Sequence, residues 1–161
     1  MRQIRKVAFR LVTVFVALSA SAWGESALAL DPKKALTQFV LDSWEMEDGL
    51  PQNSVNTITR THDGFLWFGT QEGLVRFDGV AFRVYDTSNT PGLGHDDIWA
   101  LLEDRQGTLW IGTYGGGLTE LRDGAFRTLT VRDGLPGNIV RTLAEDRSGA
   151  VWAGSLGGGL A

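Results

Sequence analysis

The chain has 161 residues, of which 43% are hydrophobic and 21% charged. This length and balance fit about one folded domain rather than a disordered chain. The net charge of −4 provides no basic stripe for phosphate, so we expect no nucleic-acid partner. Cysteine is absent, which excludes disulfides, thiolate metal sites and a cysteine nucleophile.

The first 29 residues have the three parts of a secretory signal peptide. They begin with Arg2, Arg5 and Lys6, continue with the apolar run LVTVFVAL at 11–18, and end in the A-x-A pattern Ala27-Leu28-Ala29. The apolar run is shorter than the ~20 residues of a spanning helix. We predict cleavage after Ala29, with Ala22 as the alternative site. An uncleaved N-terminal anchor is the other interpretation, and both export the rest of the chain.

The remainder of the chain is a repeat whose register is marked by tryptophan. Trp67, Trp110 and Trp152 are separated by 43 and 42 residues. A glycine follows two residues after each of them, at Gly69, Gly112 and Gly154. Within one period, short segments of alternating polarity are divided by glycine turns, which is the pattern of antiparallel strands. Four strands in a period of 40–50 residues are typical of a propeller blade.

We therefore predict an all-β fold, an incomplete β-propeller of four-stranded antiparallel blades preceded by a helical signal peptide. About two and a half blades are expected, with FVLDSW at 39–44 as an N-terminal latch strand. Because propellers close with about four to eight blades, this chain is expected to be a fragment. The predicted boundaries are 1–29 for the signal peptide, 30–47 for a linker and latch strand, and 48–161 for the partial propeller, with blades at about 48–91, 92–132 and 133–161 (truncated).

Two structural roles follow from the repeat. Each tryptophan is expected to pack against the neighbouring blade, because burying such a side chain removes on the order of 150–250 Å² from water. Asp104 and Asp146 directly precede glycine turns and are expected to cap them. The first strand of each period, for example IWALLED at 98–104, is expected to be buried on both faces.

The chain offers little catalytic chemistry. It has only two histidines, His62 and His95, and no serine in a nucleophile elbow. His95 is followed by Asp96 and Asp97, but no second ligand cluster lies in range for a metal. The glycine run at 115–117 has neither the lysine nor the helix of a phosphate loop. We expect no catalytic residue, no metal and no cofactor.

A ligand site is easier to place. In a four-stranded meander the turns after the second and fourth strands share one rim, and binding residues gather on loops held by a rigid scaffold. Ordinary solvated loops are the alternative interpretation. The candidate rim residues are Gln52, Asn53, Gln71, Glu72, His95, Asp96, Tyr114 and Asn138.

Three stretches carry a family resemblance: EDGLPQNSVNTITRTHDGFLWFGTQEGLVRFDGVAF at 47–82, DRQGTLWIGTYGGGL at 104–118 and DRSGAVWAGSLGGGL at 146–160. They resemble the two-component regulator propeller repeats of bacterial extracellular sensors, and the resemblance covers nearly all of 39–161. It implies a periplasmic seven-bladed propeller, often doubled, followed by a three-tyrosine β-sandwich, a membrane helix and a cytoplasmic histidine kinase or diguanylate cyclase. None of those downstream parts is in this sequence.

The resemblance also implies a function. The chain would be the ligand-sensing part of a parent protein that is anchored in the inner membrane and dimeric, and would not itself be an enzyme. The ligand would be a small molecule, which in some relatives is an oligosaccharide. Two alternatives stay open: a fragment of a propeller lyase or hydrolase, and a propeller with only structural or protein-interaction roles.

The signal peptide is tested by export of a reporter fused after Leu30. We expect the reporter outside the cytoplasm, and we expect Val14→Arg to block export because a charge interrupts the apolar run. Unchanged export of the arginine variant would contradict the signal-peptide interpretation.

Overall fold

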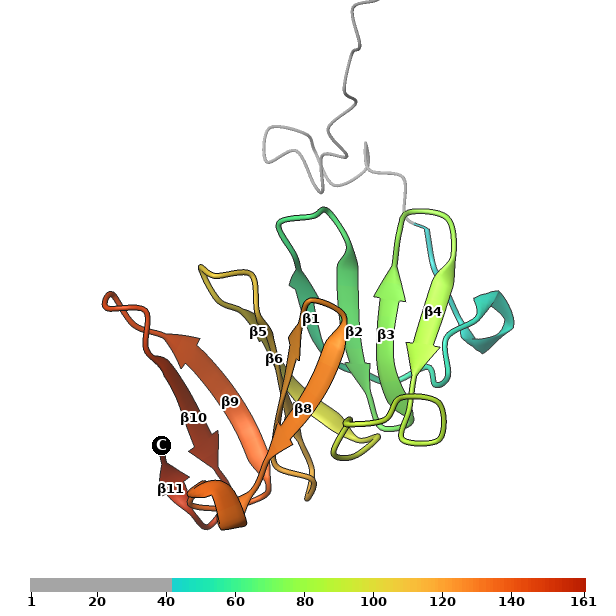
Figure 1. Ribbon diagram of the computed structural model, residues 1–161. Helices are drawn as coiled ribbons and strands as arrows, with labels where there is room; N and C mark the ends of the chain where they lie inside the picture. Colours follow the sequence, from blue (N-terminus) through green and yellow to red (C-terminus); the bar gives the residue numbers. More distant parts are fainter. Residues whose placement is uncertain (1–41) are drawn as a thin grey trace, which may run out of the picture. The chain divides into compact units, whose positions relative to one another are not determined.

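The computed structural model describes residues 42–161, so the predicted signal peptide lies outside the described residues. These residues form three antiparallel sheets, each built from consecutive strands (Figure 1). We call the sheets blades 1, 2 and 3. The fold is all-β, as predicted, and the sheets are propeller blades.

The strand bounds follow the repeat. Blade 1 contains β1 (Val55–Arg60), β2 (Leu66–Thr70), β3 (Gly73–Phe77) and β4 (Phe82–Tyr85). Blade 2 contains β5 (Ile98–Glu103), β6 (Leu109–Thr113), β7 (Leu118–Arg122) and β8 (Ala125–Leu129). Blade 3 contains β9 (Val140–Glu145), β10 (Val151–Ser155) and β11 (Gly159–Leu160). Two short 3-10 helices, η2 (Met46–Asp48) and η3 (Val131–Asp133), precede β1 and β9.

The hydrophobic core lies between blades. One buried cluster joins Trp67 and Leu74 of blade 1 to Ile98, Leu109 and Ile111 of blade 2. A second joins Leu118 of blade 2 to Val140 and Ala153 of blade 3. Because each sheet buries its apolar face against the next, a blade depends on its neighbours for stability.

The repeated glycine allows this close approach. A Cβ atom at Gly69 would lie 2.7 Å from Ile98 Cγ2 of blade 2. At Gly112 it would lie 2.9 Å from Val140 Cγ1 of blade 3. Both distances are well inside van der Waals contact, so a larger residue would push the next inner strand away.

The three tryptophans lie in successively more open surroundings. Trp67 is 5% exposed within the first cluster, and Trp110 is partly buried against the second. Trp152 is 44% exposed, since no further sheet covers that face among the described residues. Burial of a tryptophan like Trp67 is worth roughly 4–6 kcal/mol as an upper estimate.

Three details differ from the expectations. The described part of the predicted latch, residues 42–44, is not in a strand. The Trp44 ring instead packs against the Phe77 ring, with their centroids 5.5 Å apart. Blade 3 has the short third strand β11 in addition to the two that were expected. The inner strand is not buried throughout, because Ile58 on β1 is 62% exposed and only β5 lies between two described sheets.

Trp67→Ala should lower the free energy of unfolding by about 3–5 kcal/mol, because it leaves a cavity in the shared core of blades 1 and 2. Trp44→Ala is the control, since Trp44 is 48% exposed and should cost far less. Chemical denaturation of both variants measures the difference. Equal losses would show that Trp67 does not hold the two blades together.

Candidate functional site

Antiparallel strand order places all the predicted ligand residues on one rim. This rim is formed by the β2–β3 turn, the β6–β7 loop, the β4–β5 and β8–β9 connections, and the segment before β1 (Figure 1). The predicted residues on it are Gln52, Asn53, Gln71, Glu72, His95, Asp96, Tyr114 and Asn138.

Three of these side chains hold the rim itself together. Asn53 Oδ1 accepts a hydrogen bond of 2.9 Å from the backbone N–H of Met46, and Asn138 Oδ1 accepts an equivalent 2.9 Å bond from Val131. Asp96 accepts from the backbone N–H and the hydroxyl of Thr87. Their acceptor oxygens therefore fix the loops.

Other predicted residues make weaker local contacts. The Gln52 amide donates to Gln71 Oε1 at 3.2 Å, and His95 Nδ1 accepts from the backbone of Asp97 at 3.0 Å. The Glu72 side chain is exposed on the β2–β3 turn. These groups stay accessible to solvent at the edge of the rim.

Tyr114 belongs to an aromatic and cationic stack that joins blades 2 and 3. Its ring stacks on Trp99 of β5, with centroids 5.6 Å apart and planes inclined by 25°. The guanidinium carbon of Arg141 on β9 lies 4.3 Å from the Trp99 ring centroid. Tyr114 is 44% exposed. We call Trp99, Tyr114 and Arg141 the rim stack.

The inner strand of every blade has a β-bulge near its start, and two of the bulged residues belong to the rim stack. The pairing register shifts between Val55 and Thr57, between Ile98 and Ala100, and between Val140 and Thr142. The bulged residues are therefore Asn56, Trp99 and Arg141. Bulges redirect a side chain and are common next to functional sites.

Sequence reasoning missed these bulged residues, although a signal was present. Asn56, Trp99 and Arg141 each stand eleven positions before a marker tryptophan. Their chemical types differ completely, whereas the flanking positions stay apolar or small. A position whose residue type varies inside a regular repeat indicates a side chain that the repeat itself does not require.

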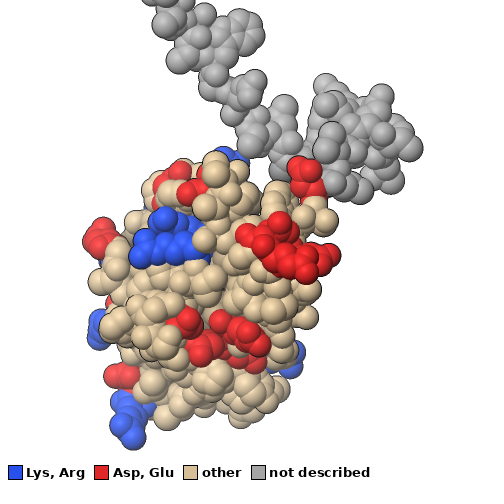
Figure 2. Space-filling view, turned by 90° about the vertical axis from the view of Figure 1, so that its right-hand side faces the viewer, with Lys and Arg blue, Asp and Glu red and all other residues tan. Residues whose placement is uncertain are grey.

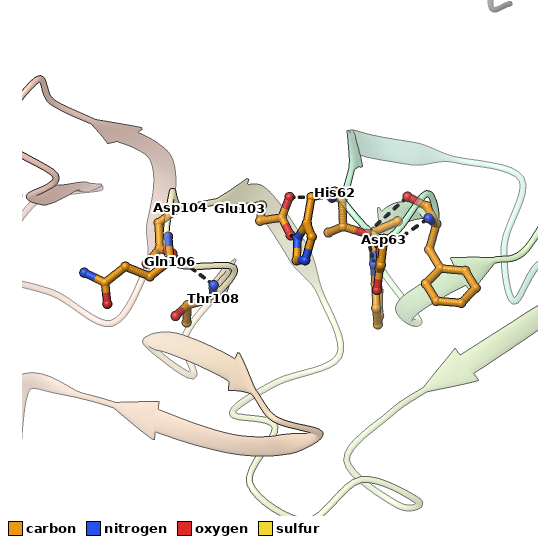
Figure 3. A network of polar contacts seen from close by, with 9 residues as sticks. His62, Asp63, Glu103, Asp104, Gln106 and Thr108 are labelled. Carbon is orange, nitrogen blue, oxygen red and sulfur yellow. Dashed lines mark hydrogen bonds and ion pairs between the residues drawn. The ribbon is translucent and has the colours of Figure 1, made fainter. Parts of the chain in front are cut away.

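The opposite rim carries a second polar network, at the turns between the first and second strands (Figure 3). His62 follows β1, and its Nδ1 lies 2.5 Å from Oε1 of Glu103 on β5. Arg105 makes the equivalent contact one blade on, with its Nε 3.6 Å from Oε1 of Glu145. These pairs link consecutive blades and are part of the scaffold.

The turn aspartates bind the marker tryptophans as well as their turns. Asp104 Oδ1 accepts from the backbone N–H groups of Gln106 and Thr108 at 2.9 Å (Figure 3), and its Oδ2 accepts from the Trp110 indole at 2.8 Å. Asp146 binds the Trp152 indole at 2.9 Å in the same way. In blade 1 the hydroxyl of Thr61 replaces this carboxylate, at 3.1 Å from Trp67.

These donors lower the pKa values of both aspartates. Burial raises the pKa of Asp104, but the donors from Trp110 and Thr108 outweigh it and hold the pKa below its ordinary value. The Ser148 hydroxyl and the Trp152 indole hold the pKa of Asp146 far below its ordinary value. Both groups are ionised structural acceptors at neutral pH.

Hollows also occur between blades 1 and 2. One of them, of about 470 Å³, lies toward the opposite rim and is lined by residues including Trp67, Arg83, Glu103 and Phe126. Among residues 42–161, no group of three side chains could hold a metal ion. On the face shown in Figure 2, acidic patches lie among scattered basic groups, so charge alone does not distinguish a binding surface there.

Comparison with known proteins identifies the repeat. Residues 49–72, 92–115 and 134–157 each match the model of the family described as two component regulator propeller. The chain carries two-component regulator propeller repeats. A histidine kinase P4 of Formosa agariphila is 43% identical over 60 residues, which are 37% of this chain and 4% of that protein.

Solved structures agree with this family. The extracellular domain of the hybrid two-component system BT3049 of B. thetaiotaomicron is 30% identical and superposes with a TM-score of 0.58, over 67% of this chain and 15% of that one. The virginiamycin B lyase of Staphylococcus aureus, 18% identical with a TM-score of 0.50 over 70% of this chain and 42% of that one, shares the fold alone. The regulator propeller chain thus spans only a small part of its sensor relatives.

Because Glu103 accepts a hydrogen bond from His62 and adds its negative charge, the pKa of His62 is raised. The pair therefore stabilises the fold below a pH of about 6.5, the unfolded value, and this contribution is lost as the pH rises through the raised folded pKa. An NMR titration should show the raised pKa, and Glu103→Gln should lower it. An unshifted His62 in the parent protein would disprove the inter-blade pair.

Proposed function

We propose that this chain is the ligand-sensing part of an exported two-component sensor and that its ligand binds on the rim that carries the rim stack. The regulator propeller repeats and the extracellular sensor domains among the structural neighbours support this class of protein. The parent would be an inner-membrane protein with this part in the periplasm, acting as a dimer with a histidine kinase or diguanylate cyclase output.

The rim stack is the observation that carries the proposal. Trp99 and Arg141 come from inner strands of two blades, and Tyr114 comes from the loop between β6 and β7. An aromatic surface beside a cation and exposed amide groups suits a saccharide, because the apolar face of a sugar ring packs on an aromatic ring while its hydroxyls bind the polar groups.

The proposed site also lies where a binding event could be transmitted from one blade to the next. Tyr114 is paired with Ile139 through a β-bridge and donates its backbone N–H to the Asp97 carbonyl at 2.9 Å. A ligand that presses on Tyr114 therefore acts on both the entry to β5 and the entry to β9. Binding of a ligand at Tyr114 can in this way change the position of blade 3 relative to blade 2.

The other functional classes have less support. A propeller lyase shares the fold at 18% identity, and a shared fold does not give a shared reaction. Within residues 42–161, no helix has the length and apolar character needed to cross a membrane.

Substitutions four residues apart separate the scaffold from the site. Tyr114→Ala in the full-length protein should leave the melting curve nearly unchanged and weaken saccharide binding, because an exposed loop side chain contributes little to stability. Trp110→Ala should instead lower the stability by about 3–5 kcal/mol and abolish binding only through unfolding.

Calorimetric melts and saccharide titrations on both variants decide between the roles. Normal binding by Tyr114→Ala would remove this residue from the site. A well-folded Trp110→Ala protein that selectively loses binding would reverse the assignment of the two aromatic residues.

A further inference from the structure

Resting on the function proposed above, we infer that the saccharide is acidic and that Arg141 binds its acidic group. The relevant feature is Arg141, which lies over an aromatic ring and forms no ion pair within residues 42–161. Arg141 is exposed on β9, and its guanidinium lies over the Trp99 ring. The ion pairs found within residues 42–161 involve His62, Arg105 and Arg127 but not Arg141.

Stacking leaves the arginine suited to an anion. A guanidinium that rests on an indole through its face keeps the N–H donors at its edge for a carboxylate or sulfate. The stack also restricts the side chain before the ligand arrives, so less conformational entropy is lost on binding. A neutral saccharide would use this charge only weakly.

The neighbouring acidic groups are already committed. Asp96 accepts two hydrogen bonds from Thr87. Asp97 Oδ1 accepts from the Asn56 amide at 3.4 Å. Arg141 is therefore a cation beside the aromatic rings of the rim, while Asp96 holds a loop and Asp97 makes an inter-blade contact.

An unsatisfied donor in the stack points to a missing acceptor. The Trp99 Nε1–H is buried and has no hydrogen-bond partner among the described residues. Buried polar groups are nearly always paired, and an unpaired one requires an explanation. Because this N–H has almost no surface open to solvent, a ligand oxygen can reach it only if a side chain of the rim stack moves when the ligand binds.

The bulge explains why Arg141 occupies this place. At the same position blade 1 has Asn56, which donates to the Ile98 carbonyl of the next blade at 2.9 Å. Blade 2 has Trp99 and blade 3 has Arg141 at equivalent bulges. One repeat position thus makes a scaffold contact in blade 1 and forms an aromatic and cationic surface in blades 2 and 3.

The test is a titration of the full-length protein with two matched pairs of probes: trigalacturonate with its methyl ester, and a sulfated galactan trisaccharide with its desulfated form. At least one acidic probe should bind more tightly than its neutral partner. Arg141→Gln should weaken that probe by about tenfold or more and change the neutral partner little. The member that binds best distinguishes a carboxylate from a sulfate.

Arg122→Gln is the matched control, because Arg122 is an exposed arginine at the end of β7, away from the rim stack, and it should bind like the parent protein. The Trp99 indole resonance, assigned with Trp99→Phe, should shift when the acidic probe binds.

Equal binding of acidic and neutral partners, unaffected by Arg141→Gln, would overturn the charge proposal and keep the saccharide site. Absence of binding by all four probes to the folded protein would overturn the proposal of an acidic saccharide, whereas binding unaffected by Tyr114→Ala would overturn the location of the site.

Discussion

The contact on which the rest of the structure depends is the packing of one blade's inner strand onto the second strand of the blade before it. Ile98 and Val140 approach the backbone at Gly69 and Gly112 so closely that no Cβ fits between them. Beside this contact a tryptophan fills the wider part of the wedge, as Trp67 does between blades 1 and 2. The close approach at the glycine and the bulk of the tryptophan together determine the distance and angle between neighbouring sheets.

The same contact positions the proposed site. The inner strands lie next to one another in space, so a bulged residue near the start of each strand comes close to its counterparts in the neighbouring blades. Asn56 reaches the carbonyl of Ile98, and Arg141 reaches Trp99. The turn aspartates and the inter-blade pairs, such as that between His62 and Glu103, hold the other rim. Most polar side chains of the opposite rim therefore stabilise the scaffold, whereas the bulged residues of the rim that carries the rim stack differ from blade to blade.

The periodicity of the sequence was sufficient to predict the fold class, because Trp67, Trp110 and Trp152 fix the register and the glycines mark the turns. It was also sufficient to place the rim, since the strand order alone determines which turns share an edge. It did not identify Trp99 and Arg141, because strict alternation along a strand does not reveal a bulge; the signal lay instead in their constant spacing of eleven residues from the tryptophans. Nor did it show that Asn53 and Asn138 bind the short helices before the inner strands, because such bonds depend on loop conformation. The signal peptide and the roles proposed for the rim residues stay predictions.

The most direct test of the account is the position of a bound saccharide in a crystal structure of the full-length sensor. The account predicts a sugar ring against Tyr114 with an acidic group at Arg141, on the rim formed by the bulged inner strands. A saccharide bound only in the hollow between blades 1 and 2, against Arg83 and Phe126, would contradict it. In that case the inter-blade groove, and not the rim stack, would be the sensing surface.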